Sequence, residues 1–137
     1  RFFVKFQPFL PINISKVTTM AKAILIVDDN PNMSTLLSEM LEVFDYESVR
    51  ASDGNEALEE LDKKSFSMVI TDMRMPNMTG LELIEKVKQK YPKLPVVLIS
   101  GYSVDSSEVS DDKIKPDGFL AKPFMMSDIE QLLNSLL

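Results

Sequence analysis

The sequence predicts a single α/β domain, with a parallel five-stranded sheet covered by helices on both faces. Short apolar runs alternate along the chain with amphipathic segments of helical period. The strongest of these runs are continuously apolar, which is typical of strands that are covered on both faces. The length of 137 residues leaves room for one core, and a content of 45% hydrophobic and 26% charged residues is typical of globular proteins.

Five runs are expected to form the strands. The run Tyr46–Ala51 (YESVRA) is more polar than the others, which suits a strand at the edge of the sheet. The other four are short and mostly apolar: Ala23–Val27, Met68–Ile70 with Thr71, Val96–Ile99 and Gly118–Ala121.

Four segments between and after these strands carry apolar residues at helical spacing, and Asn30 followed by Pro31 predicts the cap and first turn of the first helix. The predicted helices are Met33–Phe44, Asn55–Lys63, Leu81–Lys90 and Ser127–Leu137. The first places Leu36, Leu37, Met40, Leu41 and Phe44 on one face, and the apolar residues of the last are Ile129, Leu132, Leu133, Leu136 and Leu137.

The segment Ser103–Lys115 (SVDSSEVSDDKIK) is the weak element of this pattern. Serine, aspartate and β-branched residues dominate it, and these have poor helix propensity. We therefore expect at most a short or irregular helix here, and the least stable part of the domain.

Residues 1–19 (RFFVKFQPFLPINISKVTT) differ in character from the rest of the chain. They are apolar, but Pro8 and Pro11 interrupt them, so the segment resembles neither a signal peptide nor a membrane span. We interpret residues 20–137 as the domain and residues 1–19 as an extension that is encoded upstream or artificially added. Its aromatic side chains could also bind a neighbouring chain, which would give a tail-mediated dimer.

Charge and composition exclude several classes of function. Three of the 15 basic residues and none of the 21 acidic ones precede Met20, so the remainder of the chain carries a net charge of −9. Such a body repels phosphate backbones, which argues against direct nucleic-acid binding. The sequence contains no Cys and no His, so thiolate and imidazole chemistry must come from a partner. We expect a cytoplasmic protein that does not associate with a membrane.

Polar side chains follow four of the apolar runs. Asp28 and Asp29 follow Ala23–Val27, and Asp72 follows the run that begins at Met68. Ser100 follows Val96–Ile99, and Lys122 follows Gly118–Ala121. Because the carboxyl ends of parallel strands meet at one edge of a sheet, these side chains are expected to converge there.

The converging residue types indicate chemistry at a phosphoryl group. Three close carboxylates repel one another unless a cation lies between them, and Mg²⁺ is a cation that prefers such oxygen ligands. Lys122 and the Ser100 hydroxyl could then bind phosphate oxygens. One carboxylate would stay free to attack phosphorus, and Asp72, at the end of a central strand, is the best placed. Each residue alone has an ordinary explanation, such as a helix cap or a surface charge. Their combination at four strand ends favours a functional site.

From Ala23 to Leu137 the chain resembles a response-regulator receiver domain of two-component signalling, of the kind found in chemotaxis regulators. The segments that carry the resemblance are ILIVDDNP, ASDGNEAL, MVITDMRMPNMTGLELI, PVVLISGY and GFLAKPF. The resemblance implies a flavodoxin-like fold with strand order 2-1-3-4-5. It also implies a phosphoacceptor switch, which takes a phosphoryl group from a histidine kinase or phosphotransfer protein and then acts on an unidentified downstream protein. Such a domain is no enzyme beyond its own phosphorylation and dephosphorylation.

The resemblance also implies roles for individual residues. Asp72 matches the phosphorylated aspartate, Asp28 and Asp29 match the acidic pair that holds Mg²⁺, and the main-chain carbonyl of Met73 matches a further metal ligand. The matches at the last two strands are the switch hydroxyl at Ser100, the switch aromatic at Phe119, the phosphate-binding Lys122 and a Pro123 whose preceding peptide bond is typically cis.

Three other functions fit the sequence less well. A Mg²⁺ phosphatase that forms an aspartyl-phosphate would need a second aspartate two residues after Asp72, where Arg74 stands. An interaction module that never needs phosphate would have no use for the complete set of aspartates with Lys122. A GTPase or a dinucleotide-binding protein would carry GxxxxGK[ST] or GxGxxG, and neither motif occurs.

Overall fold

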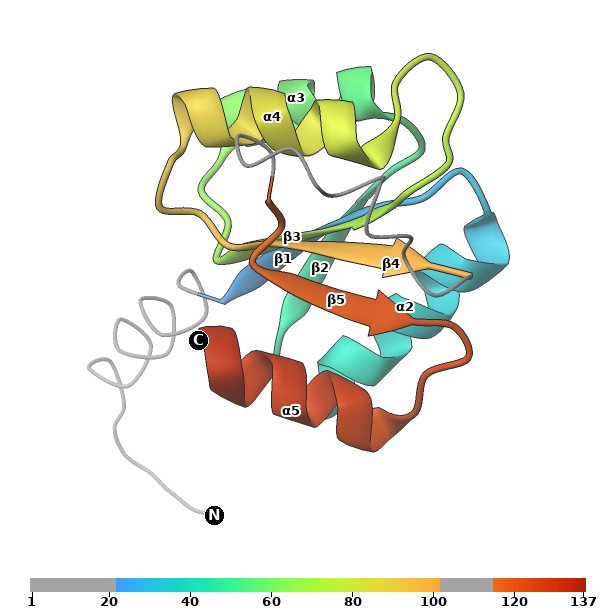
Figure 1. The fold of residues 1–137 in the computed structure, drawn as a ribbon. Helices are drawn as coiled ribbons and strands as arrows, with labels where there is room; N and C mark the ends of the chain where they lie inside the picture. Colours follow the sequence, from blue (N-terminus) through green and yellow to red (C-terminus); the bar gives the residue numbers. More distant parts are fainter. Residues whose placement is uncertain (1–21, 102–114) are drawn as a thin grey trace, which may run out of the picture.

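A five-stranded parallel sheet organises the structure, in the strand order β2-β1-β3-β4-β5 (Figure 1). The computed structural model describes residues 22–101 and 115–137. The predictions for the extension and for nearly all of Ser103–Lys115 concern residues outside these ranges. In chain order the elements are β1 (Ala23–Val27), α2 (Pro31–Val43), β2 (Glu47–Ala51), α3 (Gly54–Lys63), β3 (Met68–Asp72), α4 (Gly80–Lys90), β4 (Val96–Ser100), β5 (Gly118–Ala121) and α5 (Met126–Leu136).

Helices cover both faces of the sheet, with α3 and α4 on one face and α2 and α5 on the other (Figure 1). Successive side chains of a strand point to opposite faces. Ile24 and Ile26 of β1 therefore pack in the core beneath α2 and α5, whereas Leu25 and Val27 pack in the core beneath α3 and α4. All four side chains are fully buried, which explains the continuous apolar run and confirms the predicted three-layer fold.

The polar strand β2 lies at one edge of the sheet, as predicted. Two apolar residues of the predicted helices are exposed. Leu36 is 44% exposed because the buried stripe of α2 runs through Leu37, Met40 and Leu41, and Leu36 lies beside it. Leu137 is 49% exposed because α5 ends at Leu136 and the last residue only caps it.

Local hydrogen bonds fix where the helices near the carboxyl edge of the sheet begin. The side chain of Asn30 accepts hydrogen bonds from the backbone N–H groups of Asn32 and Met33, and Pro31 opens the helix, as predicted. Thr79 and Glu82 form a reciprocal capping box at the start of α4. None of the helices in the described part of the chain is long and apolar enough to cross a membrane.

Candidate functional site

Three aspartates meet at the carboxyl edge of the sheet. Asp28 and Asp29 directly follow β1, and Asp72 is the last residue of β3. These strands are neighbours, with Val27 opposite Thr71, so their ends lie side by side. Each aspartate offers one oxygen, and the three oxygens all lie within 4.8 Å of one another. The predicted convergence of the carboxylates is confirmed.

Asp28 is the most buried of the three carboxylates, with 3% of its surface exposed. Its Oδ1 accepts a hydrogen bond from the backbone N–H of Asn30 at 2.9 Å, whereas its Oδ2 has no hydrogen-bond partner in the part of the chain that is described. Burial raises the pKa of this carboxyl, with a further contribution from the negative charges of Asp72 and Asp29, while the Asn30 N–H and Lys122 act in the opposite direction. An ionised Asp28 is therefore costly without a cation beside it.

A hard cation fits this set of donors. The three carboxylates supply oxygen ligands, which Mg²⁺ and similar ions prefer, and the unpartnered Oδ2 of Asp28 is a buried acceptor that such an ion would satisfy. The carbonyl of Met73 accepts a hydrogen bond from the backbone N–H of Gly80 at 2.8 Å, which leaves its second lone pair for another partner. Its role as a metal ligand stays a prediction from the resemblance.

Lys122 and Ser100 complete this edge of the sheet. The Nζ atom of Lys122 lies 3.5 Å from Oδ1 of Asp72, and the backbone N–H of Lys122 donates to the Ser100 carbonyl at 2.9 Å. Because Asp72 pairs with Ile99 across β3 and β4, Ser100 lies one residue beyond the register partner of Asp72. The structure thus brings an ammonium group and a hydroxyl-bearing residue to the edge that holds the carboxylates.

Phe119 lies on β5, apart from the carboxylates. It pairs in register with Leu98 of β4, and 49% of its surface is exposed. The peptide bond between Lys122 and Pro123 is cis, as the resemblance implied. The role of Phe119 as the switch aromatic stays a prediction from the resemblance.

Gly80 is a residue of this site that the sequence reasoning missed. A Cβ atom at this position would lie 2.4 Å from the carbonyl oxygen of Asp72 and 2.8 Å from Cδ1 of Leu98. Only a glycine lets α4 begin so close to the end of β3. The sequence shows Gly80 directly before the predicted helix Leu81–Lys90, but nothing in that pattern indicates how close the backbone of Asp72 lies.

Comparisons with known proteins agree with this geometry. The family described as "Response regulator receiver domain" matches residues 24–134. The alkaline phosphatase synthesis transcriptional regulatory protein PhoP of Bacillus subtilis is 27% identical over 118 residues, which cover 86% of this chain and 49% of that protein. The chain spans between 17% and 49% of the length of the curated relatives compared here.

Two solved structures show the same fold. The chemotaxis protein CheY4 of Vibrio cholerae has a TM-score of 0.79 and 28% sequence identity, and the match covers 85% of this chain and 99% of that one. The response regulator protein TrrA of Thermotoga maritima, in complex with Mg(2+)-BeF, has a TM-score of 0.77 and 33% identity with the same coverage.

Proposed function

The chain belongs to the family of response regulator receiver domains, and from this premise we propose that Asp72 accepts a phosphoryl group from a histidine kinase or a phosphotransfer protein. Receiver domains are signalling switches of two-component systems. The observation that carries the assignment is the grouping of three carboxylates with Lys122, whose Nζ atom lies 3.5 Å from Oδ1 of Asp72.

The proposed reaction is a displacement at phosphorus. A carboxylate oxygen of Asp72 attacks the phosphorus atom, and the bond between phosphorus and the donor breaks. The donor, an imidazole nitrogen in a phosphohistidine, keeps the electron pair and takes up a proton. Because this chain has no His, the partner must supply that group. Lys122 and Ser100 hold oxygens of the transferring group, which stabilises the charge that spreads over them.

Asp28, Asp29 and Asp72 would hold a Mg²⁺ ion at this site. When bound, such an ion offsets the negative charge of the carboxylates and of the phosphoryl oxygens. The complex of TrrA with Mg(2+)-BeF supports this part of the proposal. The lack of Cys is compatible with a reducing cytoplasm, which is the location we propose.

Ser100 and Phe119 would transmit the state of Asp72 to a downstream protein. A Ser100→Ala variant is expected to accept the phosphoryl group but to lose part of the conformational response, because the hydroxyl that contacts the new group is gone. Amide chemical shifts around Phe119, recorded with and without acetyl phosphate, measure that response. Identical shift changes in both proteins would contradict the role of Ser100.

Intact mass spectrometry after incubation with acetyl phosphate and Mg²⁺ tests the acceptor. We expect the wild type to gain the mass of one phosphoryl group, and Asp72→Asn to gain none. Asp45→Asn is a matched control, because Asp45 lies at the opposite end of α2 and its φ of 67° is one that Asn adopts readily. A full mass gain in Asp72→Asn, or an equal loss in both variants, would contradict the assignment. Chelation of Mg²⁺ is expected to suppress the reaction.

A further inference from the structure

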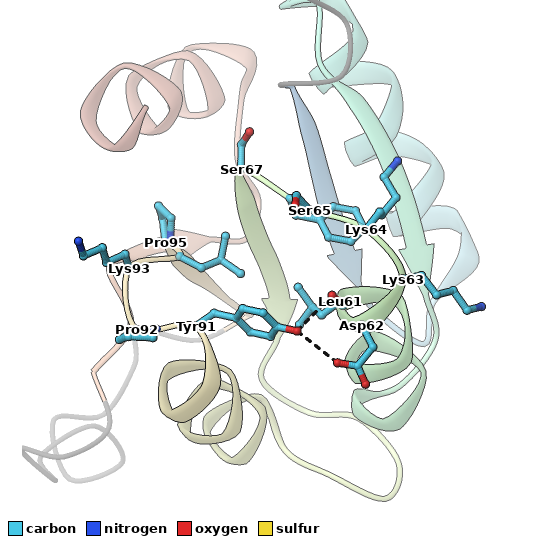
Figure 2. Close-up of a pocket in the computed structure, with 12 residues that line it drawn as sticks. Leu61, Asp62, Lys63, Lys64, Ser65, Ser67, Tyr91, Pro92, Lys93 and Pro95 are labelled. Atoms are coloured by element: carbon cyan, nitrogen blue, oxygen red, sulfur yellow. Dashed lines mark hydrogen bonds between the residues drawn. The ribbon is translucent and has the colours of Figure 1, made fainter. Parts of the chain in front are cut away.

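A second surface site lies at the amino-terminal edge of the sheet, at the far end of the strands from the aspartates. It is an open trough of 770 Å³ (Figure 2). One wall consists of residues 61–67, where α3 ends and the chain runs into β3, and the other consists of residues 91–95, which connect α4 to β4. The two walls are brought together because β3 and β4 are neighbouring parallel strands.

The floor of the trough is apolar and fixed in place. Tyr91 points across it, and its hydroxyl donates to the Leu61 carbonyl and to Oδ1 of Asp62, both at 3.2 Å (Figure 2). Phe66 and Leu94 are partly buried against the core beneath α3 and α4. The floor therefore offers apolar surface on a rigid base, as a site for an apolar side chain requires.

The rims of the trough are basic. Lys64 and Lys93 stand on opposite walls (Figure 2). Neither forms an ion pair with a carboxylate of the described residues, while the Nζ atom of Lys64 lies 5.5 Å from the centroid of the Phe66 ring. The single acidic residue of the lining, Asp62, is held by Lys90 at 2.5 Å. Lys63 pairs with Glu60 at 3.5 Å. This positive excess stands out in a chain whose net charge is −6.

We propose that the trough binds an acidic segment of a partner protein, in which an aromatic or aliphatic side chain lies between carboxylates. The apolar side chain fills the floor, and the carboxylates pair with the two opposed lysines. A planar bilayer cannot fill a concave trough. A nucleic acid carries a much denser negative charge than a short acidic segment, so the acidic body of the chain repels it more strongly. The chain's own first 19 residues carry Arg1, Lys5 and Lys16 and no acid, so they lack the complementary charge.

The test is a titration of the full-length chain with synthetic peptides, followed by amide chemical shifts. The probe is a blocked hexapeptide with Phe and Leu between two acidic residues on each side. One control peptide carries amides in place of the carboxylates, and another carries Gly and Ser in place of Phe and Leu. We expect saturable shifts at residues 61–67 and 91–95 with the probe, and at least tenfold weaker binding of either control. No saturable shift with the probe, or equal binding of a control peptide, would overturn the proposal.

Charge-reversed variants locate the binding. Lys64→Glu and Lys93→Glu are expected to weaken binding of the probe about tenfold each. Lys86→Glu is the matched control, because it makes the same change of charge on the exposed face of α4 and outside the trough. An equal loss in Lys86→Glu would mean that only the overall charge matters, and would refute the site.

Two further measurements separate other occupants of the trough. If the protein does not bind the probe but binds phosphatidylserine vesicles, and this binding depends on Lys64 and Lys93, the occupant of the trough is a lipid surface and not a peptide. Deletion of residues 1–19 is expected to leave the shifts of the trough unchanged, and a change there would identify the chain's own extension as the occupant. Asp72→Asn is expected to bind the probe like the wild type, so failure of this proposal and failure of the phosphoacceptor function are distinguishable.

Discussion

Replacement of Asp28 by Asn is expected to stabilise the protein when Mg²⁺ is absent. The wild-type carboxylate is 3% exposed, its Oδ2 lacks a partner among the described residues, and two further carboxylates lie close to it. Leaving a buried polar group unsatisfied costs about 1–3 kcal/mol, and more when it is charged. In Asp28→Asn the Oδ1 atom still accepts from the Asn30 N–H, while the new NH₂ group can donate to the neighbouring carboxylates.

We therefore expect the free energy of unfolding to rise by about 1–2 kcal/mol in Asp28→Asn. For a domain of this size that corresponds to an increase in Tm of about 3–5 °C per kcal/mol. The measurement is thermal and urea unfolding, followed by circular dichroism in a buffer with EDTA at pH 7. Asp29→Asn is the matched control, because Asp29 is exposed and its replacement is expected to change the stability little.

Addition of Mg²⁺ is expected to reduce the stability advantage of Asp28→Asn over the wild type by about 1 kcal/mol. At a concentration ten times the dissociation constant, a ligand of the native state adds RT ln 11, or about 1.4 kcal/mol. If the loss of one carboxylate makes Asp28→Asn bind Mg²⁺ ten times more weakly, the same concentration stabilises this variant by only about 0.4 kcal/mol. The reasoning would be refuted if Asp28→Asn were no more stable than the wild type in EDTA, or if Mg²⁺ stabilised both proteins equally.

The advantage of Asp28→Asn also depends on pH. Burial raises the pKa of Asp28 in the folded state, so the folded protein binds this proton more tightly than the unfolded chain does. Ionisation of Asp28 therefore lowers the free energy of unfolding of the wild type as the pH rises through the pKa of Asp28 in the folded state. Below the ordinary pKa of an aspartate, Asp28 is protonated in both states and this loss is absent. The difference in unfolding free energy between variant and wild type is expected to shrink as the pH falls towards 4. A difference that stays constant would contradict the explanation.

Two further predictions concern residues at the starts of α3 and α4. Gly80→Ala is expected to destabilise the protein by about 1–3 kcal/mol and to slow phosphorylation, because the new Cβ would meet the backbone oxygen of Asp72 at 2.4 Å. Gly54→Ala is expected to cost less in the same unfolding assay, since its nearest atom is the end of a flexible methionine side chain. Glu56 accepts from the N–H and hydroxyl of Ser52 at 2.6 and 2.8 Å, which lowers the pKa of Glu56. The ionised Glu56 side chain therefore stabilises the protein above the ordinary pKa of a glutamate, and this stabilisation is lost as the pH falls through the pKa of Glu56 in the folded state. Glu56→Gln is expected to be less stable than the wild type at pH 7 and equally stable in acid.

The sequence predicted the fold and the carboxylate cluster because both depend on the order of short segments. A continuously apolar run such as that of β1 specifies a covered strand, and its end places Asp28 at the site edge. Packing details were harder to predict. The periodicity included Leu36 in the buried stripe of α2, but the width of that stripe depends on how closely the helix lies on the sheet.

Features that join distant segments could not be predicted from local patterns. The engagement of the Met73 carbonyl depends on Gly80, which the loop between β3 and α4 brings back to it. The trough has the same origin, because its two walls are separated in the sequence by β3 and α4 and meet through the pairing of β3 with β4.

The placement of the trough and the aspartates at opposite ends of β3 and β4 has a consequence for assembly. A partner that is held at the amino-terminal edge leaves the carboxyl edge open, so both ends of one domain can be occupied together. Such a partner acts as a tether, and a phosphoryl donor or effector attached to it reaches the aspartates at a raised effective concentration, which is of millimolar order for short flexible linkers. The avidity gained in this way depends on linker length and not on any new contact at Asp72.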